Sequence, residues 1–227
     1  MTSSIGTLNE KSLHAALKAW LLQPGDRTEV PLDGYVIDIV RGDLLIEVQT
    51  RNVSAIKTKL RRLTARHPVR LVYPIAQQKW IVKLPTDEQG VPVRRKSPKR
   101  GTLLQLFDEL VSIPDLLARP TFSLEVLLIQ EEEVRRHDVR RAWRRRGWVT
   151  QERRLMGFEA APLLTEPADL ERLIPGDLAE SFTTADLARA LPAPRRSAQK
   201  MAYCLSRMGV LTREGKRGNA VVYRVEI

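Results

Sequence analysis

The chain has 227 residues, and its 38 Lys and Arg outnumber its 27 Asp and Glu, which gives a formal net charge of +11 at pH 7. This excess indicates a polyanionic partner, although charge alone does not distinguish DNA, RNA and an anionic membrane surface. The single cysteine, Cys204, excludes an intrachain disulfide and a cysteine-based zinc site. We find neither a signal peptide nor an apolar run that could span a bilayer, so we expect a soluble intracellular protein.

The first predicted helix covers residues 8–22. Its apolar stripe, at helical spacing, consists of Leu13, Leu17, Trp20 and Leu21. Glu10 precedes Leu13 by three residues and so lies on the same buried face. From the residues alone, Glu10 can form a capping box with Thr7 at the start of the helix.

A β-hairpin is predicted next, with Gly42-Asp43 as a two-residue turn between two β-rich runs. That loop length places Asp38 directly opposite Glu47. Because side chains alternate along a strand, Asp38, Glu47 and Gln49 are expected to share one face. The residues expected on the other face are Ile37, Ile39, Leu44, Ile46 and Val48. Two facing carboxylates repel each other unless a cation or a proton lies between them, so the hairpin predicts a cation site.

Ion pairing is the alternative for these two carboxylates. Asp38 and Glu47 could each pair with Arg41 or Arg51 on the same strands. Acidic residues are depleted from strands, however, and burial of an unpaired carboxylate costs several kcal/mol. We therefore favour a site for a hard divalent cation, which takes one or two carboxylates together with waters and phosphate oxygens.

Further elements complete the first predicted domain, residues 1–90. Residues 52–66 predict a second helix, with an apolar stripe on one side and basic residues elsewhere. Two strands are expected over residues 70–75 and 79–84. The segment 87–101 combines glycine, prolines and charges, and this composition is typical of a linker.

The middle region, residues 91–165, is basic and rich in β-forming residues. A short helix is expected over 103–110, followed by two partner strands over 121–134 and 147–158. The arginine-rich segment between these strands could hold phosphates, whereas a charge run more usually forms a solvated surface. The acidic run Glu131-Glu132-Glu133 could bind a metal, but ion pairing with neighbouring arginines is the preferred interpretation.

The order helix, hairpin, helix, strand and the two motifs Ile37-Asp38-Ile39 and Glu47-Val48-Gln49 resemble the PD-(D/E)XK nucleases, the superfamily of restriction endonucleases and Holliday-junction resolvases. The resemblance implies an α/β fold with a restriction-endonuclease-like α-β-β-α-β core. It also implies that Asp38 and Glu47 hold Mg²⁺ or Mn²⁺, with Glu10 as a further ligand on the first helix.

One position departs from the family pattern. Gln49 stands where the family usually has lysine, although some members resemble this chain in using glutamine. The resemblance then implies that Asp38, Glu47, Gln49 and Glu10 form a catalytic site. Because glutamine carries no positive charge, the alternative is a catalytically inactive DNA-binding regulator with a nuclease fold.

Residues 166–227 predict a third domain. Thr183 or Thr184 can cap a helix that ends before Pro192, and a second helix is expected over 195–208. Two short strands around a basic turn at residues 216–219 complete the segment. Helix, turn, helix and a basic β-hairpin resemble a winged helix-turn-helix domain, whose second helix enters the DNA major groove.

The resemblance implies DNA contacts from the second helix and from the wing; a winged helix used for protein contacts is the alternative. The expected DNA-binding residues are Arg195, Arg196, Ser197, Gln199, Lys200, Lys216 and Arg217. The sequence as a whole predicts a metal-dependent DNA endonuclease that docks through this domain. We expect it in the cytoplasm, associated with the nucleoid, with no membrane partner and as a homodimer, as is common among restriction enzymes and resolvases.

Overall fold

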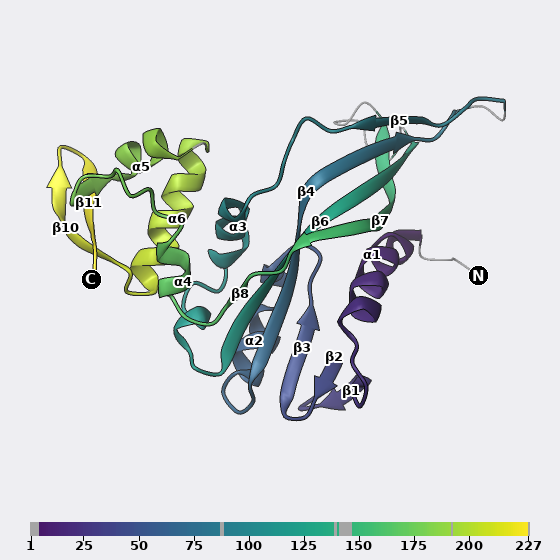
Figure 1. The fold of residues 1–227 in the computed structure, drawn as a ribbon, viewed down its shortest axis with the longest axis horizontal. Helices are drawn as coiled ribbons and strands as arrows, with labels where there is room; N and C mark the ends of the chain where they lie inside the picture. The colour runs from purple at the N-terminus through teal and green to yellow at the C-terminus, as the bar shows by residue number, and fades with distance from the viewer. Residues whose placement is uncertain (1–4, 87–88, 139, 141–146, 192, 227) are drawn as a thin grey trace.

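The computed structural model describes residues 5–86, 89–138, 140, 147–191 and 193–226, with side chains from residue 12 onward. It is a mixed α/β protein: a large mixed sheet carries helices on its faces, and a smaller C-terminal module lies at one end (Figure 1). Within the described ranges, the large sheet has eight strands and the C-terminal sheet has three. No helix in these ranges is long and apolar enough to cross a bilayer.

The first four strands contain the predicted hairpin and its neighbours. The strands of the large sheet are β1 (Arg27–Leu32), β2 (Tyr35–Arg41), β3 (Leu44–Val48), β4 (Val69–Lys83), β5 (Val93–Lys96), β6 (Phe122–His137), β7 (Trp148–Ala160) and β8 (Leu163–Leu164). Strands β1, β2 and β3 form an antiparallel meander, and β4 then runs parallel to β3. The turn at Gly42-Asp43 is confirmed, since Arg41 pairs with Leu44. Strand β1 was not predicted.

The domain boundary expected near residue 90 does not separate two sheets. Strand β6 runs parallel to β4 along almost its whole length, and β7 pairs antiparallel with β6 as predicted. The middle region therefore continues the sheet of the first domain. Strand β4 is also one long strand where two were expected, with an irregularity between Ala76 and Gln78.

Helices cover both faces of the large sheet. The helices before the C-terminal module are α1 (Ile5–Leu21), η1 (Val53–Ile56), α2 (Lys57–Leu63), η2 (Leu103–Gln105), α3 (Leu106–Leu110), η3 (Leu116–Ala118) and α4 (Ala168–Glu171). Leu13 and Leu17 of α1 pack on one face, whereas Leu60 and Leu63 of α2 pack on the other. The core beneath α2 continues through α3 into the C-terminal module. The large sheet and this module therefore share one apolar core on the α2 face.

The predicted separation of faces in the hairpin is wrong at Ile37. Ile39, Ile46 and Val48 pack with α1 as one face, but Ile37 packs in the core beneath α2. Strict alternation would place Ile37 and Ile39 together. The alternation therefore breaks around Asp38, where Glu29 on the neighbouring strand has a left-handed φ of 52°. A β-hairpin loop length fixes register, but it does not reveal such a local break.

The C-terminal module follows the predicted order. Its elements are β9 (Ser181–Thr183), α5 (Thr184–Ala190), α6 (Arg195–Arg207), β10 (Leu211–Arg217) and β11 (Ala220–Val225), with β11 between β10 and β9. Thr183 is the N-cap of α5: its hydroxyl accepts from the N–H of Asp186, whose carboxylate accepts from the N–H of Thr183. Reciprocal capping of this kind sets the start of α5 and confirms one of the two predicted caps.

Candidate functional site

Asp38 and Glu47 lie where strands β2 and β3 part. The last paired residues of the two strands on this side are Ile39 and Ile46, and the same register places Asp38 opposite Glu47, as predicted. The Oδ2 atom of Asp38 accepts from the backbone N–H of Val48 at 2.8 Å. The backbone N–H of Asp38 in turn bonds the carboxylate of Glu47. Each acidic side chain thus accepts a hydrogen bond from the backbone of the other residue's strand.

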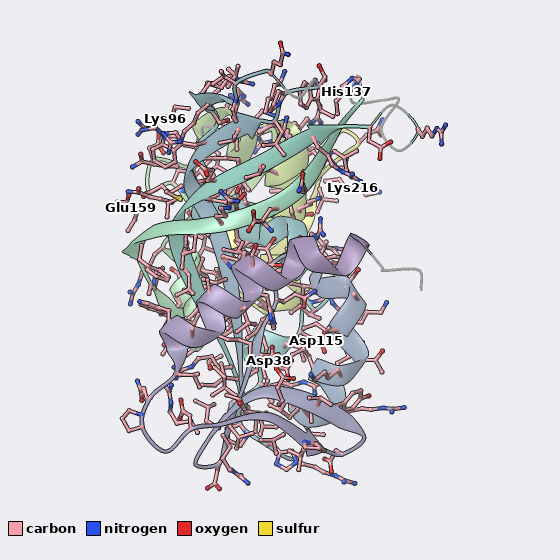
Figure 2. All side chains as sticks on the ribbon, turned by 90° about the vertical axis from the view of Figure 1, so that its right-hand side faces the viewer. Asp38, Lys96, Asp115, His137, Glu159 and Lys216 are labelled. Atoms are coloured by element: carbon pink, nitrogen blue, oxygen red, sulfur yellow. The ribbon has the colours of Figure 1, made fainter. Side chains whose placement is uncertain are left out.

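The prediction that these two side chains share one face of the sheet is wrong, because they reach this junction from different layers. The break in alternation around Asp38 turns its side chain towards α1, whereas Glu47 faces α2. Asp38 contacts α1: His14 Nε2 lies 3.3 Å from Asp38 Oδ2, and Lys18 Nζ lies 3.6 Å from Asp38 Oδ1. Figure 2 shows Asp38 beside α1. Burial alone would raise the pKa of Asp38, but hydrogen bonds from His14 and Val48 and the charge of Lys18 outweigh it, so its pKa is lowered. Asp38 is therefore ionised at neutral pH.

Glu47 faces the layer that contains α2, and it is only 4 % exposed. Lys59 of α2 places its Nζ atom 2.6 Å from Glu47 Oε1, and it also donates to the carbonyl of Val36 at 2.6 Å. Burial raises the pKa of Glu47 to about 7, and the nearby charge of Asp38 adds to this rise, while Lys59 opposes it. Glu47 thus takes up a proton close to neutral pH, as expected of a carboxylate with too little compensating positive charge.

Gln49 is held away from the two carboxylates. Its side-chain amide donates to the backbone carbonyls of Arg51 and Asn52, at 2.6 and 3.2 Å. Asn52 has a left-handed φ of 55°, so this amide closes a tight turn between β3 and η1. The nitrogen of Gln49 therefore stabilises the turn that leaves the strand.

Glu10 has only its backbone described, within α1, and its side chain lies outside the described residues. The capping box proposed for Thr7 and Glu10 is not at a helix start, because α1 begins at Ile5. The ion pairs considered for Asp38 also have different partners from those expected. Arg41 binds Asp26, with Nη2 to Oδ2 at 2.8 Å, whereas Asp38 pairs with Lys18.

Sequence reasoning left three basic or titratable side chains outside this site that the structure brings to it: His14, Lys18 and Lys59. His14 and Lys18 are four residues apart on α1 and so share a face of that helix. This spacing was the available signal. Lys59 had no comparable signal, because its approach to Glu47 depends on how α2 packs against β3.

The donor types at the junction suit a hard divalent cation. Asp38 and Glu47 provide carboxylate oxygens, and Mg²⁺ is often held by only one or two carboxylates with waters and substrate phosphates. The Oε1 atom of Glu47 is buried and faces the charge of Lys59 at 2.6 Å, so a bound cation would compete with that lysine. No group of three or more His, Cys, Asp or Glu side chains suitable for a metal occurs within the described part of the chain. A third protein ligand would have to come from a residue such as Glu10.

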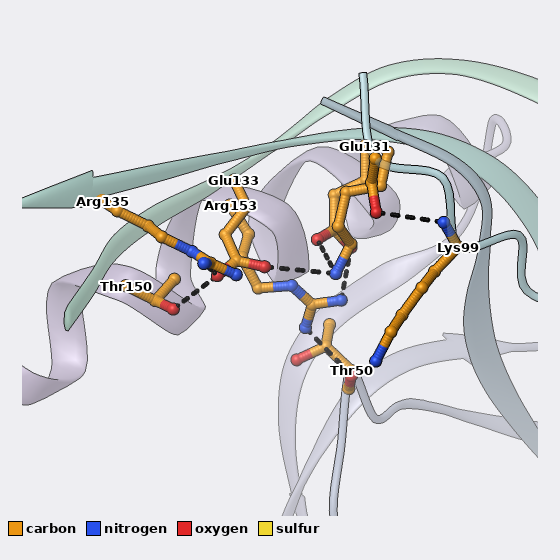
Figure 3. Close-up of polar contacts among 9 residues, drawn as sticks. Thr50, Lys99, Glu131, Glu133, Arg135, Thr150 and Arg153 are labelled. Atoms are coloured by element: carbon orange, nitrogen blue, oxygen red, sulfur yellow. Dashed lines mark hydrogen bonds and ion pairs between the residues drawn. The ribbon is translucent and has the colours of Figure 1, made fainter. Parts of the chain in front are cut away.

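A second acidic cluster lies on β6 and differs in its surroundings (Figure 3). Glu131 pairs with Lys79 at 3.1 Å and with Arg153 at 2.5 Å, and Glu133 pairs with Lys79 and Arg135. Burial opposes ionisation of Glu133, but Arg135, Thr150 and Lys79 lower its pKa to about 2. The preferred interpretation of this acidic run, ion pairing, is confirmed.

The expected DNA-binding residues of the C-terminal module divide into two groups. The exposed residues are Arg195, Arg196, Gln199, Lys216 and Arg217, with Ser197 half-buried. Lys200 instead forms an ion pair with Asp108 of α3, at 2.7 Å, which corrects its expected role as a free phosphate contact. Arg217, next to the turn of the wing, places its Nη1 atom 3.6 Å from Asp186, so the tip of the wing is tied to the start of α5. The Arg-rich segment predicted to hold phosphates falls mostly on residues 141–146, outside the described ranges.

Comparison with known proteins identifies the chain's relatives. Residues 11–164 match the model of a family described as "Domain of unknown function (DUF8091)". A protein of Treponema pallidum (strain Nichols), named only "Uncharacterized protein", is 31% identical over 226 residues, which cover 98% of this chain and 88% of the relative. No solved structure matches the chain.

Proposed function

We infer the function of this chain, which belongs to the DUF8091 family, from its geometry, and we propose that it is a metal-dependent DNA endonuclease. The observation that carries the proposal is the coupled pair of carboxylates at the parting of β2 and β3. Asp38 is ionised, whereas Glu47 has a pKa of about 7 because it is buried beside Asp38. Strongly perturbed carboxylates of this kind concentrate at functional sites.

The fold around the pair supports the same proposal. The observed order is helix α1, strands β1 to β3, helix α2 and parallel strand β4. This order supports the proposed resemblance to PD-(D/E)XK nucleases, whose core would here carry one additional strand before the hairpin. Asp38 and Glu47 occupy the two central strands of this core, and Glu10 lies on its first helix.

Asp38, Glu47 and Glu10 would hold Mg²⁺ or Mn²⁺, and a bound ion of this type polarises a scissile phosphate and lowers the pKa of an attacking water. The chain's own residues prepare the site. His14 and Lys18 keep Asp38 ionised, and Lys59 favours the ionised form of Glu47. Lys59 also brings to the site the positive charge that Gln49 lacks, at 2.6 Å from Glu47.

The C-terminal module would deliver the site to DNA. A three-stranded sheet with α5 and α6 packed on it is the arrangement expected of a winged helix-turn-helix domain. The exposed side chains at the start of α6 are Arg195, Arg196 and Gln199, and such side chains can contact phosphates and base edges. Arg196 is therefore our principal candidate for DNA contact in this module.

The test is a cleavage assay on labelled duplex, branched and single-stranded DNA, with RNA as a competitor, in Mg²⁺, Mn²⁺ or EDTA. We expect cleavage only with metal. Asp38→Asn and Glu47→Gln should each slow it by about a hundredfold or more, because several kcal/mol of transition-state stabilisation depend on the metal. Asp43→Asn is the matched control: this exposed acid lies in the turn of the same hairpin, outside the site.

Cleavage in EDTA, or cleavage that persists in both site variants, would overturn the hydrolytic proposal. Thermal unfolding of each variant shows whether a loss of cleavage reflects unfolding. A homodimer also remains a prediction, and sedimentation with and without DNA tests it.

A second candidate is a DNA-binding regulator that does not cleave. Two observations favour it: the amide of Gln49 is bound to the turn carbonyls, and each carboxylate already has a lysine partner. Salt-sensitive DNA binding without metal-dependent cleavage would select this candidate.

A further inference from the structure

A cavity of about 620 Å³ lies directly beyond the C-terminal end of β3. Thr50 and Arg51, which follow Gln49 in the chain, form part of its wall, and Tyr73 of β4 lines it from the sheet. The side-chain amide of Gln49 donates to the carbonyl of Arg51 at 2.6 Å, so the cavity wall is bonded to the motif strand. The cavity is therefore continuous with the strand that carries Glu47.

A short basic segment, Ser97–Gly101, which we call the strap, crosses the other side of the cavity. Both of its ends are bonded to β4: Ser97 N–H donates to Lys79 at 2.8 Å, and Gly101 N–H donates to Ala76 at 2.9 Å. A Cβ atom on Gly101 would lie 2.6 Å from the Ala76 carbonyl oxygen, so only glycine permits this approach. The strap thus fixes Lys99 and Arg100 at the cavity, and Figure 3 shows Lys99 extending toward Thr50.

The cavity carries an excess of positive charge. Among its described lining residues are seven Lys or Arg and three Asp or Glu, an excess of four (7 − 3). Each carboxylate already has a partner within the protein. Glu133 pairs with Lys79 and Arg135, Glu109 accepts from the N–H of Val53 and the hydroxyl of Tyr73, and Asp108 pairs with Lys200. These carboxylates are already engaged and do not neutralise the remaining cations.

Three of these cations form no ion pair among the described residues. Arg95, Lys99 and Arg100 are exposed side chains of the cavity, and they form no ion pair with a carboxylate in the described part of the chain. Arg153 supports the inner wall: it donates to the carbonyl of Thr50 at 3.1 Å and binds the buried Glu131. The result is a rigid wall with free positive charges facing the cavity, which is the arrangement that binds phosphate groups.

We propose that this cavity binds the phosphate backbone of a single nucleic-acid strand as it leaves the Asp38–Glu47 site. The inference rests on the proposed function and identifies its substrate class. The volume of about 620 Å³ is that of a pocket for a small ligand, so it accommodates a short piece of one strand and excludes a duplex. Tyr73 provides an aromatic ring beside the phosphate-binding wall, where a base can stack.

The test measures binding in EDTA, so that it does not depend on cleavage. Fluorescence anisotropy with a labelled single-stranded oligonucleotide compares the wild type with Lys99→Ala/Arg100→Ala. We expect the double variant to bind about tenfold more weakly at low salt, and the slope of log affinity against log salt to fall by about 1.4, or about 0.7 for each lost phosphate contact. Its affinity for blunt duplex should stay unchanged.

Two control proteins make the result specific. Arg66→Ala/Arg172→Ala removes two exposed positive charges that do not line the cavity, and it should retain single-strand affinity. Arg196→Ala should show the reverse pattern, with weaker duplex binding and unchanged single-strand binding. Thermal unfolding of each protein confirms that the exposed substitutions leave the fold intact.

Two outcomes would overturn the inference. The first is equal single-strand affinity and equal salt slope in the strap variant and its charge-matched control. The second is competition by a free mononucleotide as strong as that by the oligonucleotide, which would assign the cavity to a nucleotide ligand. Absence of cleavage together with the expected binding losses would instead contradict only the hydrolytic function.

Discussion

The carboxylates of β6 and those at the junction of β2 and β3 differ in how their charge is compensated. On β6, Glu131 and Glu133 form ion pairs with Lys79, Arg135 and Arg153, and the pKa of Glu133 falls to about 2. At the junction of β2 and β3, Glu47 pairs with a single cation among the described residues, Lys59, and its pKa rises to about 7.

Burial alone does not explain this difference. Both carboxylates are buried, since Glu133 is 8 % exposed and Glu47 is 4 % exposed. What differs is the number of cations and donors that each carboxylate receives. A buried carboxylate with enough partners holds strands together, whereas one with too few can bind a proton or a metal ion. The residue type and the strand position of an acidic residue therefore do not show whether it belongs to a structural cluster or to a functional site.

The largest effect should come from breaking the compensated cluster. Glu131→Gln removes the charge that Lys79 and Arg153 share, and it should lower the free energy of unfolding by about 3–5 kcal/mol. Urea denaturation measures this loss. Glu152→Gln is the control, because its partner Arg154 is an exposed side chain and such surface pairs contribute about 1 kcal/mol or less. Equal stabilities of the two variants would contradict the structural role of the cluster.

A smaller effect should follow from the pH dependence of Glu47. Its pKa in the folded state is about 7, above the ordinary value of 4.5, so the folded protein keeps a proton that the unfolded chain releases within this window. The free energy of unfolding should consequently fall as pH rises from 4.5 to 7, by up to about 3 kcal/mol. Below this window the stability contributed by the proton is fully present, and above it that stability is lost.

Urea denaturation at several pH values checks the sign of this effect. Glu47→Gln should flatten the dependence, because glutamine does not titrate. Glu133→Gln should keep it, since the pKa of Glu133 lies near 2 and outside the window. A Glu47→Gln protein with an unchanged pH dependence would show that another group is responsible. Cleavage should rise over the same pH range, because metal binding requires the ionised carboxylate.

The smallest effect concerns the turn that sets the register of Asp38 and Glu47. Gly42 has a φ of +56°, so Gly42→Ala should cost about 1–2 kcal/mol of stability, although no atom would clash with the added methyl group. Gly176→Ala, at an equally open position without a left-handed φ, should cost less. Equal melting temperatures for the two variants would show that the turn conformation is not under strain.

Local patterns predicted much of the fold. Helical spacing located α1 and α6, Thr183 marked the start of α5, and a composition rich in β-forming residues located β6 and its partner β7. Strand β1 was not predicted because it is a short edge strand that contains Pro31 and the left-handed Glu29 and is followed by the left-handed Asp33. The continuity of the sheet across residue 90 was also not predicted from the sequence, since pairing between β4 and β6 joins segments some fifty residues apart.

The sequence by itself determined the register of the hairpin that carries Asp38 and Glu47, because a two-residue turn fixes that register. The tertiary structure decided what surrounds them. Lys59 meets Glu47 only through the packing of α2, His14 and Lys18 meet Asp38 only through that of α1, and Lys200 meets Asp108 only where α6 contacts α3. The pKa of a buried carboxylate is set by such neighbours, and neighbours that are distant in sequence are brought together by packing rather than by spacing.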